Sequence, residues 1–195
     1  MLKGFKLKQL LTITLMAVIS FIIMFLEMPL PIFPEFLKVD LSDLPALITG
    51  LALGPVAGIL VELLKNVLHL LRTSTGGVGE LANFLVGVAL ILPSSIIYKK
   101  NQNKKLLIMS MVGGILLMGL VGGLANYFIL LPFYQNFMPM EAIIGLGSAV
   151  NPAIKDTFTL ILYAIIPFNI LKGIVVTIFT MALYKRVSPL IKSIN

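Results

Sequence analysis

The chain has 195 residues, of which 58% are hydrophobic and 12% are charged, and its mean hydropathy is +1.05. Soluble domains are roughly 45–50% apolar, so this composition excludes an ordinary water-soluble fold and predicts one integral membrane domain over residues 1–195. The net charge of +7 lies in short clusters at the ends of apolar segments, which disfavours nucleic acid as a partner. Because the sequence has no cysteine, disulfides, thiolate metal sites and cysteine nucleophiles are excluded.

The first apolar segment, Leu10–Met28, follows the lysines Lys3, Lys6 and Lys8. A basic start of this kind resembles a signal peptide. However, the segment has no small-residue cleavage site, and its apolar run is longer than that of a signal peptide. We therefore expect a retained first transmembrane helix.

Two shorter apolar segments follow, at 41–53 and 55–71, and the pair Gly54-Pro55 separates them. The first piece gives only about 20 Å of helix at 1.5 Å per residue, against a hydrocarbon core of about 30 Å. One continuous span is therefore a competing interpretation. A Gly-Pro pair is a strong helix breaker, which favours two separate helices.

Three longer apolar segments, Glu80–Tyr98, Leu106–Phe133 and Pro167–Tyr184, complete a prediction of six transmembrane helices in an all-α fold. Basic residues concentrate in cytoplasmic loops. Threading six spans places every basic cluster on the same side, whereas fusing the second and third segments separates them. We therefore predict that both termini are cytoplasmic. Besides the N-terminal lysines, the clusters are Lys99, Lys100, Lys104 and Lys105, and Lys185, Arg186 and Lys192.

This topology places three segments outside the membrane: Pro29–Asp40, Arg72–Gly79 and Tyr134–Ile166. The last segment contains a further apolar stretch, Phe158–Ile166. The sequence leaves two interpretations of this stretch open: a half-helix that dips into the membrane, or a helix that lies across the outer mouth.

Polar side chains concentrate in the outer halves of four predicted helices. An ionisable residue at the centre of a membrane helix costs about 2.5–3.5 kcal/mol on insertion scales, so such residues face a protein interior or a wet cavity. The inner halves of these helices are apolar, and besides Gly, Ser and Thr they hold almost no polar residues. The sequence therefore predicts a polar cup that opens only outward, which is typical of a capture protein rather than a channel. Its polar residues are Glu62, Lys65, Asn66, His69, Glu80, Asn83, Asn126, Asn169 and Lys172.

Two interpretations stay open for part of this cup. Glu62 and Lys65 are three residues apart on one helix face, so they either neutralise each other or contact a ligand. Asn126, Asn169 and Lys172 favour ligand contact, because no acidic residue in its own helix can pair with Lys172.

Catalytic motifs do not appear in this sequence. The single histidine is not part of a metalloprotease spacing, and Ser148 lies in a Gly-Leu-Gly-Ser run that is too common to indicate a protease. No nucleotide-binding glycine loop is present, so any dependence on ATP must come from a partner. We therefore predict that the chain is not an enzyme, and the polar cup disfavours a purely structural role.

Six runs of residues occur in order along nearly the whole chain: Phe36–Leu47, Gly54–Gly58, Lys65-Asn66, Glu80–Phe84, Asn126-Tyr127 and Pro167–Gly173. These runs resemble the S components of energy-coupling factor (ECF) transporters, and in particular their riboflavin-specific branch. The match is more specific for the S-component class than for the vitamin, because the Gly-Pro segment recurs in members that bind other vitamins.

The resemblance implies six helices with an outward pocket that the first external loop, about Pro29–Ser42, caps. It implies a subunit of the prokaryotic plasma membrane that binds riboflavin as the transported substrate, without a cofactor. Import is expected to occur by reorientation in the membrane together with a transmembrane coupling protein and two ATPases. The alternative is the same architecture with another vitamin or a flavin-related precursor as the ligand.

The polar cup and the resemblance together define the expected substrate-binding residues. An asparagine amide offers a donor and an acceptor in one plane, so Asn126 or Asn169 can read the pyrimidine edge of a flavin, while Lys172 can donate to a carbonyl or to the ribityl hydroxyls. Apolar side chains can sandwich the flavin ring. The full set is Phe36, Leu37, Lys38, Asp40, Lys65, Asn66, Glu80, Asn83, Asn126, Tyr127, Asn169 and Lys172.

In the family, a face of small residues on the first helix docks the coupling protein. Here Ala17 has Ile13 and Phe21 four residues away on either side, so this chain departs from that pattern. We expect Thr14, Ala17 and Ser20 to form the partner interface instead.

Overall fold

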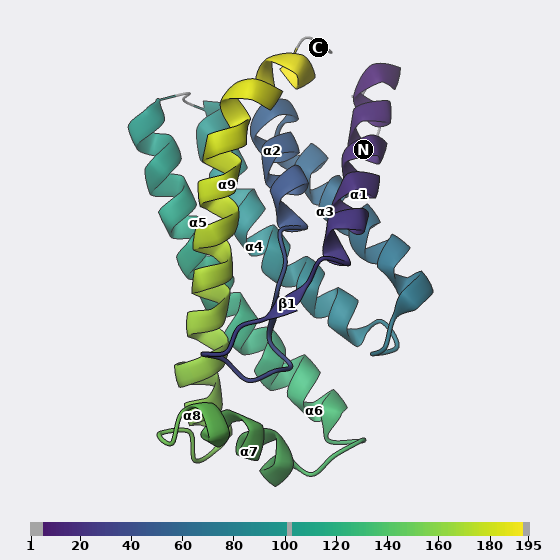
Figure 1. Cartoon of the computed structure of the whole chain (residues 1–195). Helices are drawn as coiled ribbons and strands as arrows, with labels where there is room; N and C mark the ends of the chain where they lie inside the picture. Colours follow the sequence, from purple (N-terminus) through teal and green to yellow (C-terminus); the bar gives the residue numbers. More distant parts are fainter. Residues whose placement is uncertain (1–5, 101–102, 193–195) are drawn as a thin grey trace.

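The computed structural model describes residues 6–100 and 103–192, so Lys3 lies outside the described residues. It confirms the predicted all-α fold, apart from one short hairpin in which β1 (Met28–Pro29) pairs antiparallel with β2 (Lys38–Val39) (Figure 1). The helical elements are α1 (Leu7–Met24), α2 (Asp43–Leu53), α3 (Pro55–His69), the 3₁₀ turn η1 (Leu70–Arg72), α4 (Val78–Lys100), α5 (Lys104–Ala125), the π-helix η2 (Asn126–Leu130), α6 (Leu131–Tyr134), α7 (Met140–Val150), α8 (Thr157–Leu160), the π-helix η3 (Ile161–Ile165) and α9 (Ile166–Lys192).

The break between α2 and α3 lies at the predicted Gly-Pro pair. Gly54 has a φ angle of 105°, which side chains rarely tolerate, and Pro55 occupies the first position of α3, where a missing N–H costs nothing. The two helices pack closely because Gly50 and Gly58 face each other: a Cβ on Gly58 would lie 2.8 Å from the Gly50 Cα. The prediction of two helices rather than one continuous span is therefore confirmed.

Helix length alone does not establish six membrane spans. Among the described residues, four helices are long and apolar enough to cross a membrane: Leu7–Met24, Val78–Lys100, Lys105–Tyr134 and Thr157–Tyr184. Helices α2 and α3 have only 11 and 15 residues. Because a full crossing takes about 20 residues, these two helices cover only part of the membrane thickness each.

The stretch Phe158–Ile166 is neither a dipping half-helix nor a helix across the outer mouth. It forms α8, η3 and the start of α9, which together are the first part of the last long helix, Thr157–Tyr184. Asp156 caps this helix by accepting a hydrogen bond from the Thr159 N–H at 2.8 Å. This bond and a second one from the Thr159 hydroxyl hold the pKa of the Asp156 carboxyl below its ordinary value.

The helices run alternately up and down between two ends of the bundle (Figure 1). At one end the Tyr98 and Tyr184 rings lie 5.8 Å apart, and the Tyr184 hydroxyl lies 3.4 Å from the Leu51 carbonyl oxygen. The start of α1 and the ends of α4 and α9 lie here, so this is the basic end of the molecule. Helices α6, α7 and α8 lie at the opposite end, the pocket end.

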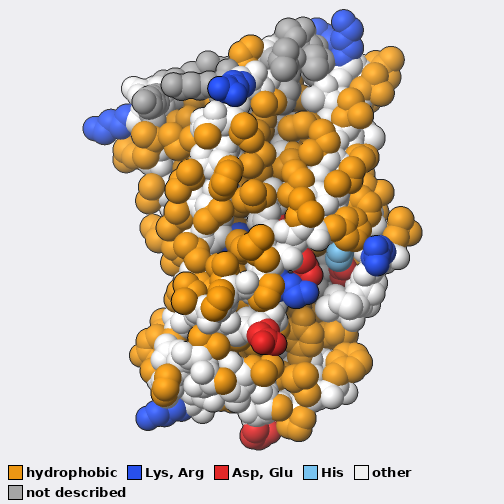
Figure 2. Space-filling model, in the orientation of Figure 1, with side chains coloured by type: hydrophobic (Ala, Val, Ile, Leu, Met, Phe, Trp, Pro, Cys, Tyr) orange, Lys and Arg blue, Asp and Glu red, His pale blue; other side chains and the backbone are white. Residues whose placement is uncertain are grey.

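An apolar core joins the helices at the centre of the bundle. Leu47, Leu90, Met118 and Val176 are fully buried in it. Large apolar side chains also cover the outer sides of the bundle, as Figure 2 shows. Apolar surface that surrounds a folded bundle in this way indicates a protein that faces lipid.

Candidate functional site

A cavity of about 370 Å³ opens near the pocket end. This volume is within the range of about 300–1,000 Å³ that is typical of small-molecule sites. Its walls come from the end of α1, the β1–β2 hairpin, the loop before α4, α4 itself, η2, α6 and α9. The sequence predicts that four helices carry polar side chains at one level, and residues from all four line the cavity, although α3 contributes only His69.

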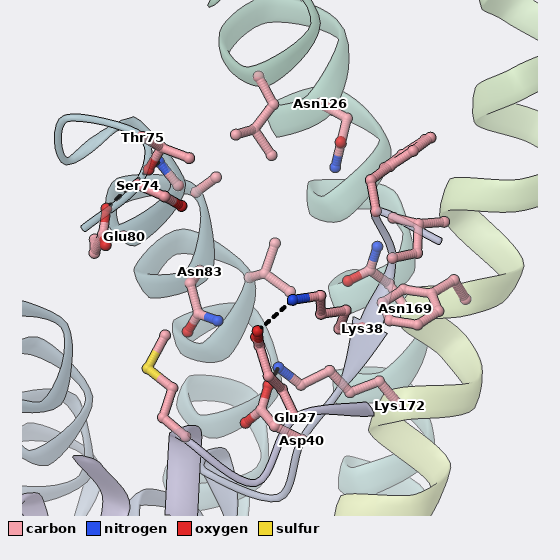
Figure 3. A pocket seen from close by; sticks show the side chains of 18 of the residues that line it. Glu27, Lys38, Asp40, Ser74, Thr75, Glu80, Asn83, Asn126, Asn169 and Lys172 are labelled. Carbon is pink, nitrogen blue, oxygen red and sulfur yellow. Dashed lines mark hydrogen bonds and ion pairs between the residues drawn. The ribbon is translucent and has the colours of Figure 1, made fainter. Parts of the chain in front are cut away.

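Three asparagines from three helices line the cavity: Asn83, Asn126 and Asn169 (Figure 3). The Asn126 amide nitrogen donates to the Gly122 carbonyl at 2.8 Å, and that of Asn169 donates to the Ile165 carbonyl at 2.9 Å. One of the two N–H donors of each amide is therefore used by the preceding helical turn. The amide oxygens stay available as acceptors for a ligand that donates hydrogen bonds.

The two π-helical turns lie next to these asparagines. Pro132 and Pro167 cannot donate a backbone hydrogen bond, and the residue before each proline donates five residues back instead of four: Leu131 N–H to Asn126 and Ile166 N–H to Ile161. The resulting turn η2 starts at Asn126, and the resulting turn η3 ends at Ile165, one helical turn before Asn169. Such π-helical turns frequently occur at functional sites.

The ammonium group of Lys172 lies among these polar walls. Its Nζ lies 2.9 Å from Asp40 Oδ2 and 3.2 Å from Asp43 Oδ2. Asp40 precedes α2, and its other oxygen accepts a hydrogen bond from the Ser42 N–H at 2.7 Å. The acidic partners that α9 lacks therefore come from the segment before α2 and from the first residue of α2, which packs against α9. The sequence of α9 alone does not indicate them, because they lie far away along the chain.

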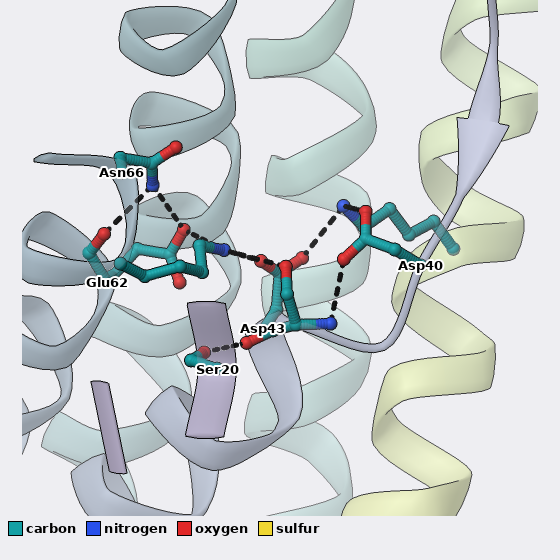
Figure 4. Close-up of polar contacts among 8 residues, drawn as sticks. Ser20, Asp40, Asp43, Glu62 and Asn66 are labelled. Atoms are coloured by element: carbon teal, nitrogen blue, oxygen red, sulfur yellow. Dashed lines mark hydrogen bonds and ion pairs between the residues drawn. The ribbon is translucent and has the colours of Figure 1, made fainter. Parts of the chain in front are cut away.

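A second set of charges is fully buried away from the cavity lining (Figure 4). Lys65 Nζ lies 2.6 Å from Asp43 Oδ1 and 2.5 Å from Glu62 Oε1, and its side chain has no exposed surface. The Asn66 amide nitrogen donates to the same Glu62 oxygen at 3.0 Å. Neutralisation of Glu62 by Lys65 is thus the interpretation that the structure confirms, and Lys65 and Asn66 do not line the cavity.

Glu80 holds one rim of the cavity. One of its carboxylate oxygens lies 2.8 Å from His69 Nδ1, and the other accepts hydrogen bonds from the hydroxyls of Thr73 and Thr75 at 2.9 and 3.1 Å. These contacts fasten the loop between η1 and α4 to the start of α4. His69 also lines the cavity, as the polar cup predicts.

The first external loop forms the opposite rim. Phe36, Leu37 and Lys38 line the cavity from this loop, and Lys38 Nζ lies 2.6 Å from Glu27 Oε1. The Phe33 ring packs edge-to-face against the Phe168 ring of α9, with 5.4 Å between centroids. The loop thus lies against the cavity.

The structure places most of the predicted binding residues at the cavity, with Lys65, Asn66 and Tyr127 as the exceptions. The Tyr127 side chain is half exposed and packs edge-to-face against the neighbouring Phe128 ring instead. The sequence analysis did not predict several of the residues that line the cavity. Among them, only Phe168 could have been found from the sequence, because it is next to Asn169. The missed residues include Met24, Glu27, Ser74, Thr75, Val86, Leu130, Tyr134 and Phe168.

The expected partner face on α1 is largely turned inward. Ala17 is buried in the apolar core, and Ser20 is fully buried with its hydroxyl donating to the Ser42 carbonyl. Thr14 is exposed, and its hydroxyl donates to the Leu10 carbonyl at 3.0 Å. Of the three residues, only Thr14 is therefore exposed on the surface of this chain, and the partner interface stays a prediction.

Comparison with known proteins identifies the family. Residues 8–184 match the family described as ECF transporter, substrate-specific component. "Riboflavin transporter RibU" of Staphylococcus aureus (strain TCH60) is 38% identical over 187 residues, which cover 96% of this chain and 94% of that protein. "Riboflavin transporter FmnP" of Bacillus subtilis (strain 168) is 36% identical over 192 residues, which cover 96% and 95%.

A solved structure described as the S component of a bacterial ECF transporter has the same fold. The TM-score is 0.75 at 36% sequence identity, over 95% of this chain and 98% of that one. The chain therefore belongs to the substrate-specific components of ECF transporters, and the family resemblance seen in the sequence is confirmed. Its relatives are named as transporters, in agreement with the prediction that the chain is not an enzyme.

Proposed function

We propose that this chain is the riboflavin-binding subunit of an ATP-driven vitamin importer. The observation that carries the proposal is a cavity of ligand size whose walls combine three asparagine amides with Lys172 and apolar side chains. Riboflavin pairs a flat apolar ring with a polar edge and a hydroxylated chain, so it matches both kinds of wall. Two relatives that are similar over almost their whole length are named riboflavin transporters.

The cavity residues divide the recognition of riboflavin between them. Asn126 or Asn169 presents its amide oxygen to the donor on the polar edge of the ring, and Lys172 donates to a ring carbonyl or a ribityl hydroxyl. Phe36 and Leu37 from the first external loop cover one face of the ring. Riboflavin is bound as the transported substrate, and its binding requires no cofactor in this chain.

Delivery of riboflavin requires movement of the subunit rather than passage through a pore. The apolar core cluster begins beside the cavity at Val86 and extends to Tyr98 and Tyr184 at the basic end. A polar ligand in this cavity therefore meets packed apolar side chains instead of a wet path. Reorientation of the whole subunit, driven by a coupling protein with two ATPases, avoids the need for such a path.

We further propose six membrane segments in a prokaryotic plasma membrane, with the basic end in the cytoplasm and the cavity open outward. The positive-inside rule supports this orientation, because Lys99, Lys100 and Arg186 gather at the basic end. The chain has no cysteine, so single-cysteine variants label cleanly. A membrane-impermeant maleimide should label Glu141→Cys in intact cells and Lys99→Cys only after permeabilisation. The reverse pattern would contradict the orientation.

The substrate itself is tested with the protein purified in detergent from cells grown with riboflavin. We expect yellow protein with a flavin absorption spectrum, and stoichiometric quenching of riboflavin fluorescence by the ligand-free form. A colourless protein that quenches no flavin would contradict riboflavin as the substrate. Another vitamin or a flavin-related precursor would then become the ligand of the same architecture.

A further inference from the structure

An alternating row of buried charges runs from the cavity into the protein. In order, its members are Asp40, Lys172, Asp43, Lys65 and Glu62, and each contacts the next at 2.5–3.2 Å. Only Asp40 and Lys172 line the cavity. The row connects α9 to the loop before α2, then α2 to α3 (Figure 4).

Asp43 is the link between the two halves of this row. Its side chain is 1% exposed, its Oδ1 accepts a hydrogen bond from Lys65 at 2.6 Å, and its Oδ2 lies 3.2 Å from Lys172 Nζ. Among the described residues, it is the only acidic side chain that pairs with both lysines. Its place in the first turn of α2 also favours a negative charge, because the helix dipole is positive there.

The two carboxylates determine where the Lys172 ammonium points. An ammonium group has three N–H donors. Asp40 Oδ2 accepts a hydrogen bond from Lys172 Nζ at 2.9 Å, and Asp43 Oδ2 forms an ion pair with the same ammonium at 3.2 Å. The two carboxylates thus hold the ammonium between them, while N–H donors remain for a ligand in the cavity. Without the Asp43 charge, Asp40 would be the only carboxylate that holds the Lys172 ammonium. The ammonium would then be free to shift toward Asp40 and the segment before α2.

We propose that Asp43 is a positioning residue for ligand binding: it does not touch the ligand, but it sets the position of Lys172 in the cavity. This inference rests on the proposed function. Glu62 provides a matched contrast, because it is equally buried and pairs with Lys65 at 2.5 Å but does not contact Lys172. Moreover, the row holds three carboxylates and two ammonium groups, so a neutral side chain in place of Glu62 balances the charge.

The test compares Asp43→Asn with Glu62→Gln in the full-length protein in detergent. Both changes replace a buried carboxylate by an amide of the same size. We expect Asp43→Asn to weaken riboflavin binding by at least tenfold in a fluorescence-quenching titration, while Glu62→Gln stays within about threefold of the unmodified protein. Equal dissociation constants for both variants and the unmodified protein would overturn the inference, whatever their melting temperatures.

A second variant and a second measurement cover the other outcomes. If Asp43→Asn does not fold, Asp43→Glu keeps the charge but moves it, and we expect at least a fivefold loss of affinity. Acetylation of Lys172 by acetic anhydride, followed by peptide mass spectrometry, needs no ligand. We expect severalfold faster modification in the Asp43 variants than in Glu62→Gln, and equal rates would overturn the inference. Failure of the unmodified protein to bind riboflavin would count against the proposed function alone.

Discussion

Two polar regions lie next to each other in this bundle, and they use the same residue types in opposite ways. Asn169 at the cavity and Asn66 beside the buried Lys65–Glu62 pair each donate to a backbone carbonyl one helical turn back, at 2.9 Å in both cases. Asn169 then presents its oxygen to the cavity, whereas Asn66 also donates to Glu62 and has no surface there. Local helix geometry is therefore the same for a ligand-facing and a structural asparagine, and the neighbours decide the role.

The comparison also separates affinity from stability. Lys65 and Glu62 pair with each other and do not line the cavity, so a ligand gains nothing from them directly, and the loss of Lys65 leaves unpaired charge in an apolar interior. Residues of the cavity keep open hydrogen-bonding capacity, which costs little while water fills the site. Substitution of Lys65 should thus act mainly on unfolding, and substitutions in the cavity mainly on binding.

The largest effect is expected for Lys65→Met. This change leaves Asp43 and Glu62 buried without their shared ammonium, and breaking a buried ion pair costs about 3–5 kcal/mol. A strongly lowered melting temperature of the purified protein is the measurement. Adding Glu62→Gln to this variant should restore part of the loss. The exposed Lys155→Met serves as the control, and an equal small effect from both lysines would contradict a stabilising role of the row.

Asn169→Ala should have the next largest effect, and on binding rather than folding. A buried ligand donor left without its acceptor costs about 1.5–3 kcal/mol, or on the order of tenfold to a hundredfold in affinity. The riboflavin dissociation constant from fluorescence quenching checks this. Tyr127→Phe is the control, because the Tyr127 ring packs on Phe128 and does not line the cavity. Similar losses in both variants would mean that the Tyr127 hydroxyl reaches the ligand.

Gly122→Ala tests the position of the Asn169 amide without removing it. A Cβ on Gly122 would lie 2.5 Å from the Asn169 amide nitrogen, so the side chain must shift. We expect roughly a tenfold loss of riboflavin affinity, equivalent to about 1.4 kcal/mol. Gly113→Ala on the same helix is the matched control, since a Cβ there meets open space. Unchanged affinity in Gly122→Ala would indicate that the bound ligand does not depend on the present Asn169 position.

The smallest effect is expected for Glu27→Gln at the cavity mouth. The Glu27 and Lys38 side chains are each 45% exposed, and exposed ion pairs contribute about 0–1 kcal/mol. The riboflavin dissociation constant should therefore change by less than about fivefold. The difference from the unmodified protein should shrink further in high salt, because ions screen exposed pairs. A loss of riboflavin affinity as large as that of Asn169→Ala would show that the Glu27–Lys38 ion pair holds the first external loop closed over the bound ligand.

Part of the cavity was predictable because some of its residues violate the pattern of a membrane helix. Asn126, Asn169 and Lys172 interrupt apolar runs, and a polar group at that depth needs a polar neighbour. Lys65 and Asn66 interrupt their helix in the same way, yet the cost of burying them is met by Asp43 and Glu62. A polar residue at membrane depth therefore predicts a polar contact, but it does not predict whether the contact is a ligand or the protein itself.

The sequence by itself determined the membrane setting, the break at Gly54, the family and the level at which polar side chains gather. These properties depend on composition, on local backbone preferences and on spacing along single helices, all of which are local. Only the tertiary structure decided which helix faces meet. It paired Lys172 with Asp40 and Asp43 across 132 and 129 positions of the chain, turned Ala17 and Ser20 inward, and continued the last helix back to Thr157. Such contacts depend on the packing angles of whole helices, which no short stretch of sequence specifies.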